Sequence, residues 1–220
     1  MNFESAEKLF EKHNISIKKQ SLEKILNFYN FMLEENKKYN IASIKDESVF
    51  FEKNIVDSLI ITKVLDKIEG NLIDIGSGNG LPGLILKSAF PDLDVTLIDA
   101  EMKKIKFLQQ AVKLFFDNVK IIHGRAEDYF KKSKVKFDFV TAKALVSKPE
   151  KWVRWTVPFV NPGGIVINYK TKKFLEELSL PEVKSYIESR NISLYKTYDY
   201  CIEESERTLV LLKKRGKNEI

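Results

Sequence analysis

The stretch that decides the fold reads Asp74-Ile75-Gly76-Ser77-Gly78-Asn79-Gly80-Leu81-Pro82-Gly83. It follows a short apolar segment and opens a stretch with helical spacing. Glycines at such a junction let the backbone turn sharply and approach a ligand without a Cβ in the way. In an open parallel sheet, ligands bind at this place, beyond the carboxyl ends of the strands. The stretch therefore predicts a ligand-binding loop in an α/β protein, and residues 76–83 are called the glycine loop below.

The chemistry of the glycine loop distinguishes two kinds of ligand. Its letters match the dinucleotide fingerprint at 78, 80 and 83, which favours NAD. However, the carboxylate of Asp74 would repel a pyrophosphate, whereas it suits the cationic amine and sulfonium of S-adenosylmethionine. Pro82 also lacks a backbone N–H that a phosphate would use. We expect S-adenosylmethionine, bound by Asp74 and by Gly76, Gly78 and Gly80. A nicotinamide-dependent oxidoreductase is the alternative.

Three further segments follow predicted strands, so they should meet at the same edge of the sheet. Asp99 stands where an acidic residue contacts ribose hydroxyls, although it could also be a helix N-cap. Gly124–Asp128 can contact an adenine ring, or can be an acidic start of a helix. Thr141–Lys143 would lie over the transferable methyl group, although a lysine after a strand is usually solvated.

Apolar segments alternate with helical stretches from residue 71 onward, which predicts βαβ units. We expect a doubly wound, mostly parallel, seven-stranded Rossmann-like sheet, with its last two strands paired as a hairpin across Cys201–Glu206. Helices are predicted near 83–89, 102–116, 126–131 and 149–159. The predicted strands are Leu72–Ile75, Val95–Ile98, Val119–Ile122, Phe137–Thr141, Ile165–Asn168, Ser193–Tyr198 and Thr208–Leu212.

The first third of the chain reads as helical. Helices are predicted over 4–13 and 47–68, and a third helix carries an apolar stripe between them. The short polar stretch 66–70 ends in a glycine, so we expect an N-terminal helical extension, 1–68, packed on an S-adenosylmethionine-binding domain, 69–220. The stripe consists of Leu22, Ile25, Leu26, Tyr29, Met32 and Leu33.

Composition narrows the class of protein. The 220 residues carry a net charge of +6 and a pI near 9.1, which suits an anionic partner such as RNA but also a lysine-rich proteome. Cys201 is the only cysteine and the two histidines lie far apart, so we expect no metal site. No apolar run reaches the roughly 20 residues of a membrane helix, and the N-terminus does not resemble a signal peptide. We expect a cytoplasmic monomer.

Several residues near the predicted site have plainer interpretations. His123 is interpreted as a structural histidine, and Trp152 and Trp155, three residues apart on a predicted helix, as core. Lysines at 170, 172 and 173, and the basic tail 213–217, could contact phosphate but are interpreted as solvated surface.

At these motifs the chain resembles the bacterial small-subunit ribosomal RNA guanine-N7 methyltransferases, also called glucose-inhibited division protein B. The glycine loop ending in Leu-Pro-Gly, together with Gly-Arg-Ala-Glu, is specific to this family. The matching segments cover most of the chain in order: Asn36–Ile41, Phe51–Leu59, Asp74–Gly83, Leu97–Phe107, Gly124–Glu127, Thr141–Leu145, Asn161–Gly164 and Arg207–Lys213.

The resemblance implies S-adenosylmethionine bound around Gly76, Leu81, Ala126 and Glu127, and a guanine of 16S ribosomal RNA, free or in the small subunit, as the substrate. The family usually has histidine at Asn54, arginine at Lys143 and Lys-Gly at Lys170-Thr171. Lysine keeps the charge but not the planar fork of arginine.

Guanine N7 carries a free lone pair, so the enzyme needs to orient the base rather than to remove a proton. Lys143 is predicted to act at the catalytic site, by pairing with the cofactor carboxylate or with a phosphate of the RNA. An RNA-binding module without catalysis, in which the sheet is only a scaffold, is the second alternative.

Overall fold

The fold is built on one seven-stranded sheet in the order β3-β2-β1-β4-β5-β7-β6, in a computed structural model that describes residues 1–143 and 148–216. The first five strands are parallel, whereas β7 runs antiparallel between β5 and β6. The prediction of a mostly parallel seven-stranded sheet is confirmed. The strands are β1 Asn71–Ile75, β2 Asp94–Asp99, β3 Val119–His123, β4 Phe137–Thr141, β5 Val160–Lys170, β6 Ile192–Ile202 and β7 Ser205–Lys214.

The order of the strands creates the binding edge of the sheet. From β1 the chain steps outward through β2 to β3, then returns to place β4 on the other side of β1. The connections after β1 and β4 therefore leave the sheet in opposite directions, which opens a crevice at the carboxyl ends of these strands.

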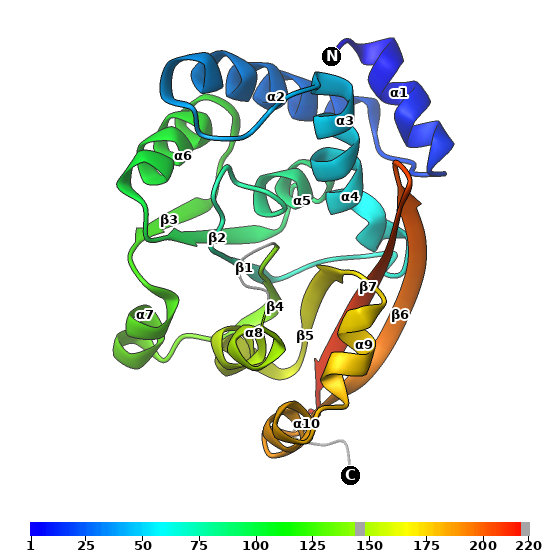
Figure 1. The fold of residues 1–220 in the computed structure, drawn as a ribbon. Helices are drawn as coiled ribbons and strands as arrows, with labels where there is room; N and C mark the ends of the chain where they lie inside the picture. The colour runs from blue at the N-terminus through cyan, green and yellow to red at the C-terminus, as the bar shows by residue number, and fades with distance from the viewer. Residues whose placement is uncertain (144–147, 217–220) are drawn as a thin grey trace.

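Helices cover both faces of the sheet, because successive residues of the strands point to opposite sides and bury apolar side chains on each. Leu72 packs in one buried cluster and Ile73 in the other. One face carries α5 and α6, and the other carries α7, α8, α9 and α10 (Figure 1). These helices are α5 Gly83–Ala89, α6 Met102–Phe115, α7 Ala126–Ser133, α8 Pro149–Thr156, α9 Lys173–Leu178 and α10 Pro181–Glu188.

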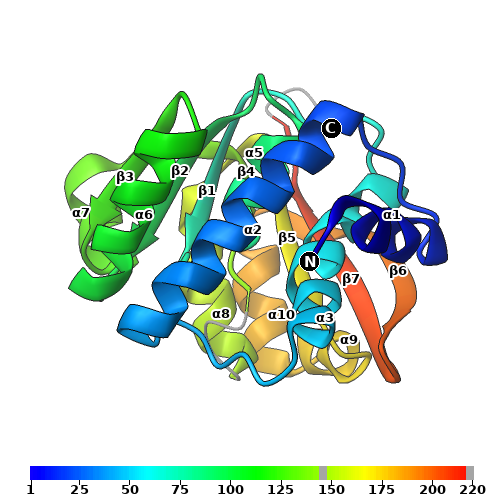
Figure 2. The ribbon, with the colours of Figure 1, turned by 90° about the horizontal axis from the view of Figure 1, so that it is seen from above.

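The N-terminal extension lies on the face of α5 and α6. Its long helix α2 contacts both of them, and Figure 2 shows it lying across them. Phe28 of α2 packs against Phe107 and Phe116, with ring centroids 6.3 and 5.6 Å apart. The extension consists of α1 Phe3–Lys12, α2 Lys19–Tyr39, α3 Glu47–Phe51, a π-helical turn Glu52–Val56, α4 Asp57–Leu59 and a 3-10 turn Ile60–Lys63.

The structure corrects the sequence-based picture of the C-terminal third. Helices α9 and α10 were not predicted, yet Phe174 and Leu178 of α9 and Val183 and Ile187 of α10 are buried under the sheet. The hairpin turn is shorter than the predicted 201–206. Ile202 pairs with Ser205, so only the two residues between them form the turn. A charged stretch of six residues is typical of a loop. Here most of it belongs to the end of the β6–β7 hairpin, at the edge of the sheet, where charged side chains stay solvated.

In the part of the chain that the structure describes, no helix combines the length and the apolar character that crossing a bilayer requires.

We propose that the extension, 1–68, and the domain, 69–220, unfold as one unit, because one buried cluster includes residues of both. Phe28→Ala should then lower the free energy of unfolding by about 3–5 kcal/mol. Both tryptophans, Trp152 and Trp155, lie in α8 on the opposite face of the sheet. Far-ultraviolet circular dichroism and tryptophan fluorescence should therefore shift together in urea.

The control is Tyr39→Ala, on the same helix, because Tyr39 is 59% exposed. A Phe28→Ala protein that loses helicity first, while its tryptophan transition stays at the wild-type position, would contradict the single cooperative unit.

Candidate active site

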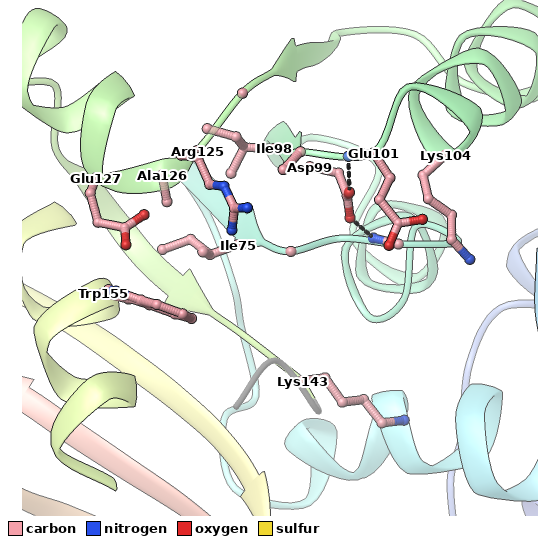
Figure 3. A pocket seen from close by; sticks show the side chains of 14 residues that line it. Ile75, Ile98, Asp99, Glu101, Lys104, Arg125, Ala126, Glu127, Lys143 and Trp155 are labelled. Atoms are coloured by element: carbon pink, nitrogen blue, oxygen red, sulfur yellow. Dashed lines mark hydrogen bonds between the residues drawn. The ribbon is translucent and has the colours of Figure 1, made fainter. Parts of the chain in front are cut away.

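A cavity of about 360 Å³ opens at the carboxyl ends of β1, β2 and β4. This is the crevice that the strand order predicts. Its wall combines backbone of the glycine loop, after β1, with side chains that follow β2, β3 and β4. The lining residues are Ile75, Gly76, Gly78, Ile98, Asp99, Ala100, Glu101, Lys104, Gly124, Arg125, Ala126, Glu127, Lys143 and Trp155 (Figure 3).

Asp99 attaches the glycine loop to the end of β2. Its Oδ2 accepts a hydrogen bond of 2.8 Å from the Gly78 amide, and its Oδ1 accepts one of 2.8 Å from the Glu101 amide. The Gly78 backbone has φ +54°, a conformation that favours glycine. A carboxylate has about four acceptor positions, so Asp99 retains capacity to accept hydrogen bonds from hydroxyl groups in the cavity.

Asp74 lies behind the loop, completely buried. Its Oδ2 accepts a hydrogen bond of 2.9 Å from the Gly83 amide. Its Oδ1 has no partner among the described residues, and neither has Oγ1 of Thr141, the residue opposite it in the β1–β4 ladder. Burial raises the pKa of Asp74 to about 7, against the effects of the Gly83 amide and of the positive charge of Lys143.

The glycine loop thus contributes to the cavity only through its first half. Gly76 and Gly78 line the cavity, whereas Gly80, Leu81 and Asp74 do not. A Cβ on Gly80 would lie 2.5 Å from a side-chain carbon of Leu84, so this glycine allows close packing of the helix that follows.

Lys143 lines the cavity, but its ammonium group is paired with residues that do not. Its Nζ lies 2.7 Å from Oδ2 of Asp57 and 3.1 Å from the carbonyl oxygen of Lys53. Figure 3 shows the side chain extending from the end of β4 toward the helical segment of the extension. Burial lowers the pKa of Lys143, and the charge of Asp57 opposes that shift.

Asp57 is a residue of the site that the sequence-based analysis missed. It is completely buried and also accepts hydrogen bonds from Arg207, at 2.9 Å, and from the hydroxyl group of Tyr200, at 2.7 Å. A carboxylate inside the apolar run from Ile55 to Leu59 was the available signal, because acids are rarely buried without a partner.

The remaining wall comes from α7 and α8. Gly124, Arg125, Ala126 and Glu127 line the cavity, so the predicted segment after β3 does reach it. His123 does not line the cavity; it is exposed, with Nε2 3.2 Å from the carbonyl oxygen of Ala100.

The prediction that both tryptophans belong to the core is right for Trp152 and wrong for Trp155. Trp152 is buried, and its Nε1 donates to the carbonyl oxygen of Ala142 at 3.0 Å. Trp155 is only half-buried and lines the cavity. Residues three apart on a helix differ in direction by about 60°, which is enough to turn one ring from the core to its edge.

Lys104 also lines the cavity, and the sequence-based analysis did not predict this. Its Nζ contacts the carbonyl oxygen of Ile41 and Oδ1 of Asn79, the latter at 3.0 Å, and thereby links the segment after α2 to the glycine loop. Asn54, where histidine is usual in the family, donates its side-chain amide to the Phe50 carbonyl oxygen at 3.0 Å. Ala144 and Leu145 of the matching segment, and Lys217 of the basic tail, lie outside the described residues.

The raised pKa of Asp74 predicts a pH-dependent cost to stability. The folded protein keeps a proton on Asp74 up to about pH 7, whereas the unfolded chain releases it near the usual value of 3.8. The contribution of this group to stability is therefore present below about pH 4 and lost as the pH rises to about 7. Asp74→Asn, which cannot titrate, should gain stability relative to the wild type from pH 5 to pH 8.

Urea unfolding of both proteins at the two pH values measures this gain, with Asp94→Asn, at the exposed start of β2, as the control. An equal difference between Asp74→Asn and the wild type at pH 5 and pH 8 would contradict the assigned protonation.

Comparison with known proteins shows the family to which this chain belongs. A family model described as GidB, rRNA small subunit methyltransferase G, matches residues 21–205. The chain is 38% identical to the ribosomal RNA small subunit methyltransferase G of Leuconostoc citreum, over 75% of this chain and 71% of that protein. It is 31% identical to the protein of the same name from Thermotoga neapolitana, over 96% of this chain and 90% of that protein.

Solved structures show the same fold at low sequence identity. TrmN from Thermus thermophilus has a TM-score of 0.59 at 14% identity, covering 81% of this chain and 53% of that one. TYW2 from M. jannaschii, solved in complex with AdoMet, has a TM-score of 0.57 at 18% identity, covering 74% of this chain and 76% of that one. The family match extends over most of the chain, and this protein therefore belongs to the GidB family, rRNA small subunit methyltransferase G.

Proposed function

We propose that this protein transfers a methyl group from S-adenosylmethionine to N7 of a guanine in 16S ribosomal RNA. Membership of the GidB family makes it an S-adenosylmethionine-dependent ribosomal RNA methyltransferase. The structural observation that carries the proposal is the cavity in which Asp99, bonded to the Gly78 amide, faces the residues after β3.

The residues around the cavity fit this cofactor. Asp99 would accept hydrogen bonds from the two ribose hydroxyls, and Ala126 and Glu127 would contact the adenine. Gly76 and Gly78 leave the backbone accessible for the amino acid part. When bound, S-adenosylmethionine supplies an electrophilic methyl group on a sulfonium ion.

The carboxylates favour this cofactor over NAD. Asp99, Glu101 and Glu127 line the cavity. Lys104, Arg125 and Lys143 line the same cavity, so its wall carries charges of both signs. A carboxylate close to a sulfonium or ammonium group would stabilise it, whereas a carboxylate close to a pyrophosphate would repel it. We propose that Asp74, Gly80 and Leu81 act on the cofactor indirectly. They would fix the shape of the glycine loop without lining the cavity themselves.

The reaction makes modest demands on the protein. Because N7 has a free lone pair, no side chain needs to take a proton from the guanine before attack. The task is to hold the base in line with the methyl group and to exclude water. We propose that Lys143 contributes as a positioning residue: it lines the cavity, and its ammonium group is fixed by Asp57.

The RNA partner is proposed from the family and from the charge. The chain carries a net charge of +6, which favours contact with phosphates. The substrate would be 16S ribosomal RNA or the small subunit, in the cytoplasm, and the protein would act as a monomer. Because proteins read RNA bases mainly when these are unstacked, the target guanine should lie in a loop or be turned out of the helix.

Methyl transfer tests the function directly. Purified protein should transfer tritium from methyl-labelled S-adenosylmethionine to undermethylated 16S ribosomal RNA, and the label should map to guanine N7. Asp99→Ala should remove the acceptors for the ribose hydroxyls and weaken S-adenosylhomocysteine binding by roughly 2–4 kcal/mol, on the scale of hydrogen bonds to a charged group.

The matched control is Asp94→Ala, at the other end of the same strand, which should leave binding and transfer unchanged. Label found elsewhere than on N7 would reject the proposed target. Unchanged affinity of a folded Asp99→Ala protein in calorimetry would reject the role of Asp99.

Lys143 gives a separate prediction. Lys143→Met keeps the stem but loses the pairing with Asp57, and should slow single-turnover methyl transfer by about a hundredfold, the effect of a small misplacement of reacting groups. Lys143→Arg should stay close to the wild-type rate, since a guanidinium group can pair with Asp57. Rapid-quench measurements on both proteins at saturating cofactor check this, and equal rates for wild type and Lys143→Met would remove Lys143 from the site.

A further inference from the structure

Trp155 has a position that the needs of the protein core do not explain. It lies in the last turn of α8, half-buried, with its ring in the wall of the cavity. Among the described lining residues it is the only aromatic one. Figure 3 shows its indole facing the cavity below Ile75, Ala126 and Glu127.

Trp152, one turn earlier on the same helix, provides the contrast. Its ring is completely buried, donates to the Ala142 carbonyl oxygen and packs edge-on against Phe174 at 5.4 Å. Trp152 thus fills the core beneath α8. A second large ring left partly open to solvent costs free energy unless a ligand covers it.

The helix that carries Trp155 is anchored at two points. Trp152 attaches α8 to the residue that follows β4, and Arg154 stacks on Tyr186 of α10, 4.9 Å from the centre of its ring. A side chain on an anchored helix loses little conformational freedom when a ligand packs on it, so its contact area converts efficiently into affinity.

The opposite wall has an apolar part that ends at a carboxylate. Ile75, Ile98 and Ala126 line the cavity on the side of β1, β2 and α7, and Asp99 lies at the end of β2 next to Ile98. An apolar slot beside a hydrogen-bond acceptor suits a flat base attached to a sugar with free hydroxyl groups. An adenosine group has both 2′- and 3′-hydroxyls, whereas a nucleotide within an RNA chain keeps only the 2′-hydroxyl.

We propose that Trp155 is the aromatic wall against which the adenine of the cofactor stacks, opposite Ile75, Ile98 and Ala126. The assignment rests on the proposed function, because it takes the adenosine to be that of S-adenosylmethionine. It adds a binding residue from α8 to the site formed by the ends of β1, β2 and β3.

Fluorescence separates the two tryptophans. Titration with S-adenosylhomocysteine should quench the emission of the wild-type protein, because the adenine stacks on Trp155. In Trp155→Phe, only the buried Trp152 emits, so the quenching should disappear while calorimetry gives an affinity within about threefold of wild type. Trp155→Leu removes the ring and should weaken binding about tenfold, within the range measured for stacking of a base on an aromatic side chain.

Phe31→Leu is the matched control, since Phe31 is also a half-buried aromatic residue on a helix but lies in α2 and does not line the cavity. It should leave both quenching and affinity unchanged. Wild-type affinity in a folded Trp155→Leu protein would overturn the assignment and leave the proposed function intact.

Two other outcomes would also overturn it. Quenching of Trp155 by unmethylated 16S ribosomal RNA, but not by S-adenosylhomocysteine that calorimetry shows to be bound, would assign the ring to the target guanine instead. A wild-type protein that binds no S-adenosylhomocysteine in calorimetry would reject the proposed function together with this assignment.

Discussion

The buried carboxylate of Asp57 is the interaction on which the arrangement of the molecule depends. It accepts hydrogen bonds from three elements that lie far apart in sequence: Lys143 after β4, Tyr200 in β6 and Arg207 in β7. A buried charge without partners costs several kcal/mol, so these donors hold the segment that carries Asp57 in one place. These contacts fix the extension against β6, β7 and the end of β4.

The hydrogen bonds around Asp57 also fix the position of the Lys143 ammonium group. A free lysine at the end of β4 would be a mobile charge, and its side chain could reach cofactor or RNA. Paired with Asp57 it is 9% exposed and directed away from Asp99. The extension therefore does more than cover the α5 and α6 face, because it decides where a cation of the methyltransferase domain lies.

The rest of the cavity divides its tasks between backbone and side chains. Asp99 holds the glycine loop through the Gly78 amide, and Asp74 holds the following turn through the Gly83 amide. Each carboxylate uses part of its hydrogen-bonding capacity for the loop, and Asp74 retains an oxygen without a partner among the described residues. In the proposed function, this site would orient the cofactor for a reaction on guanine N7 that needs no general base.

The sequence by itself determined the order of the strands and of the helices up to α8, because apolar periodicity and the glycine loop depend on local geometry, but it did not indicate α9 and α10. It also indicated Asp99, Ala126 and Glu127, since residues at the ends of parallel strands must meet at one edge. Only the tertiary structure decided the partner of Lys143, because Asp57 is 86 residues away from it in the chain, and Arg207, which also pairs with Asp57, is 64 residues away on the other side. The same holds for Trp155: helical spacing places it near Trp152, but the way α8 packs on the sheet turns one ring into the core and the other into the cavity.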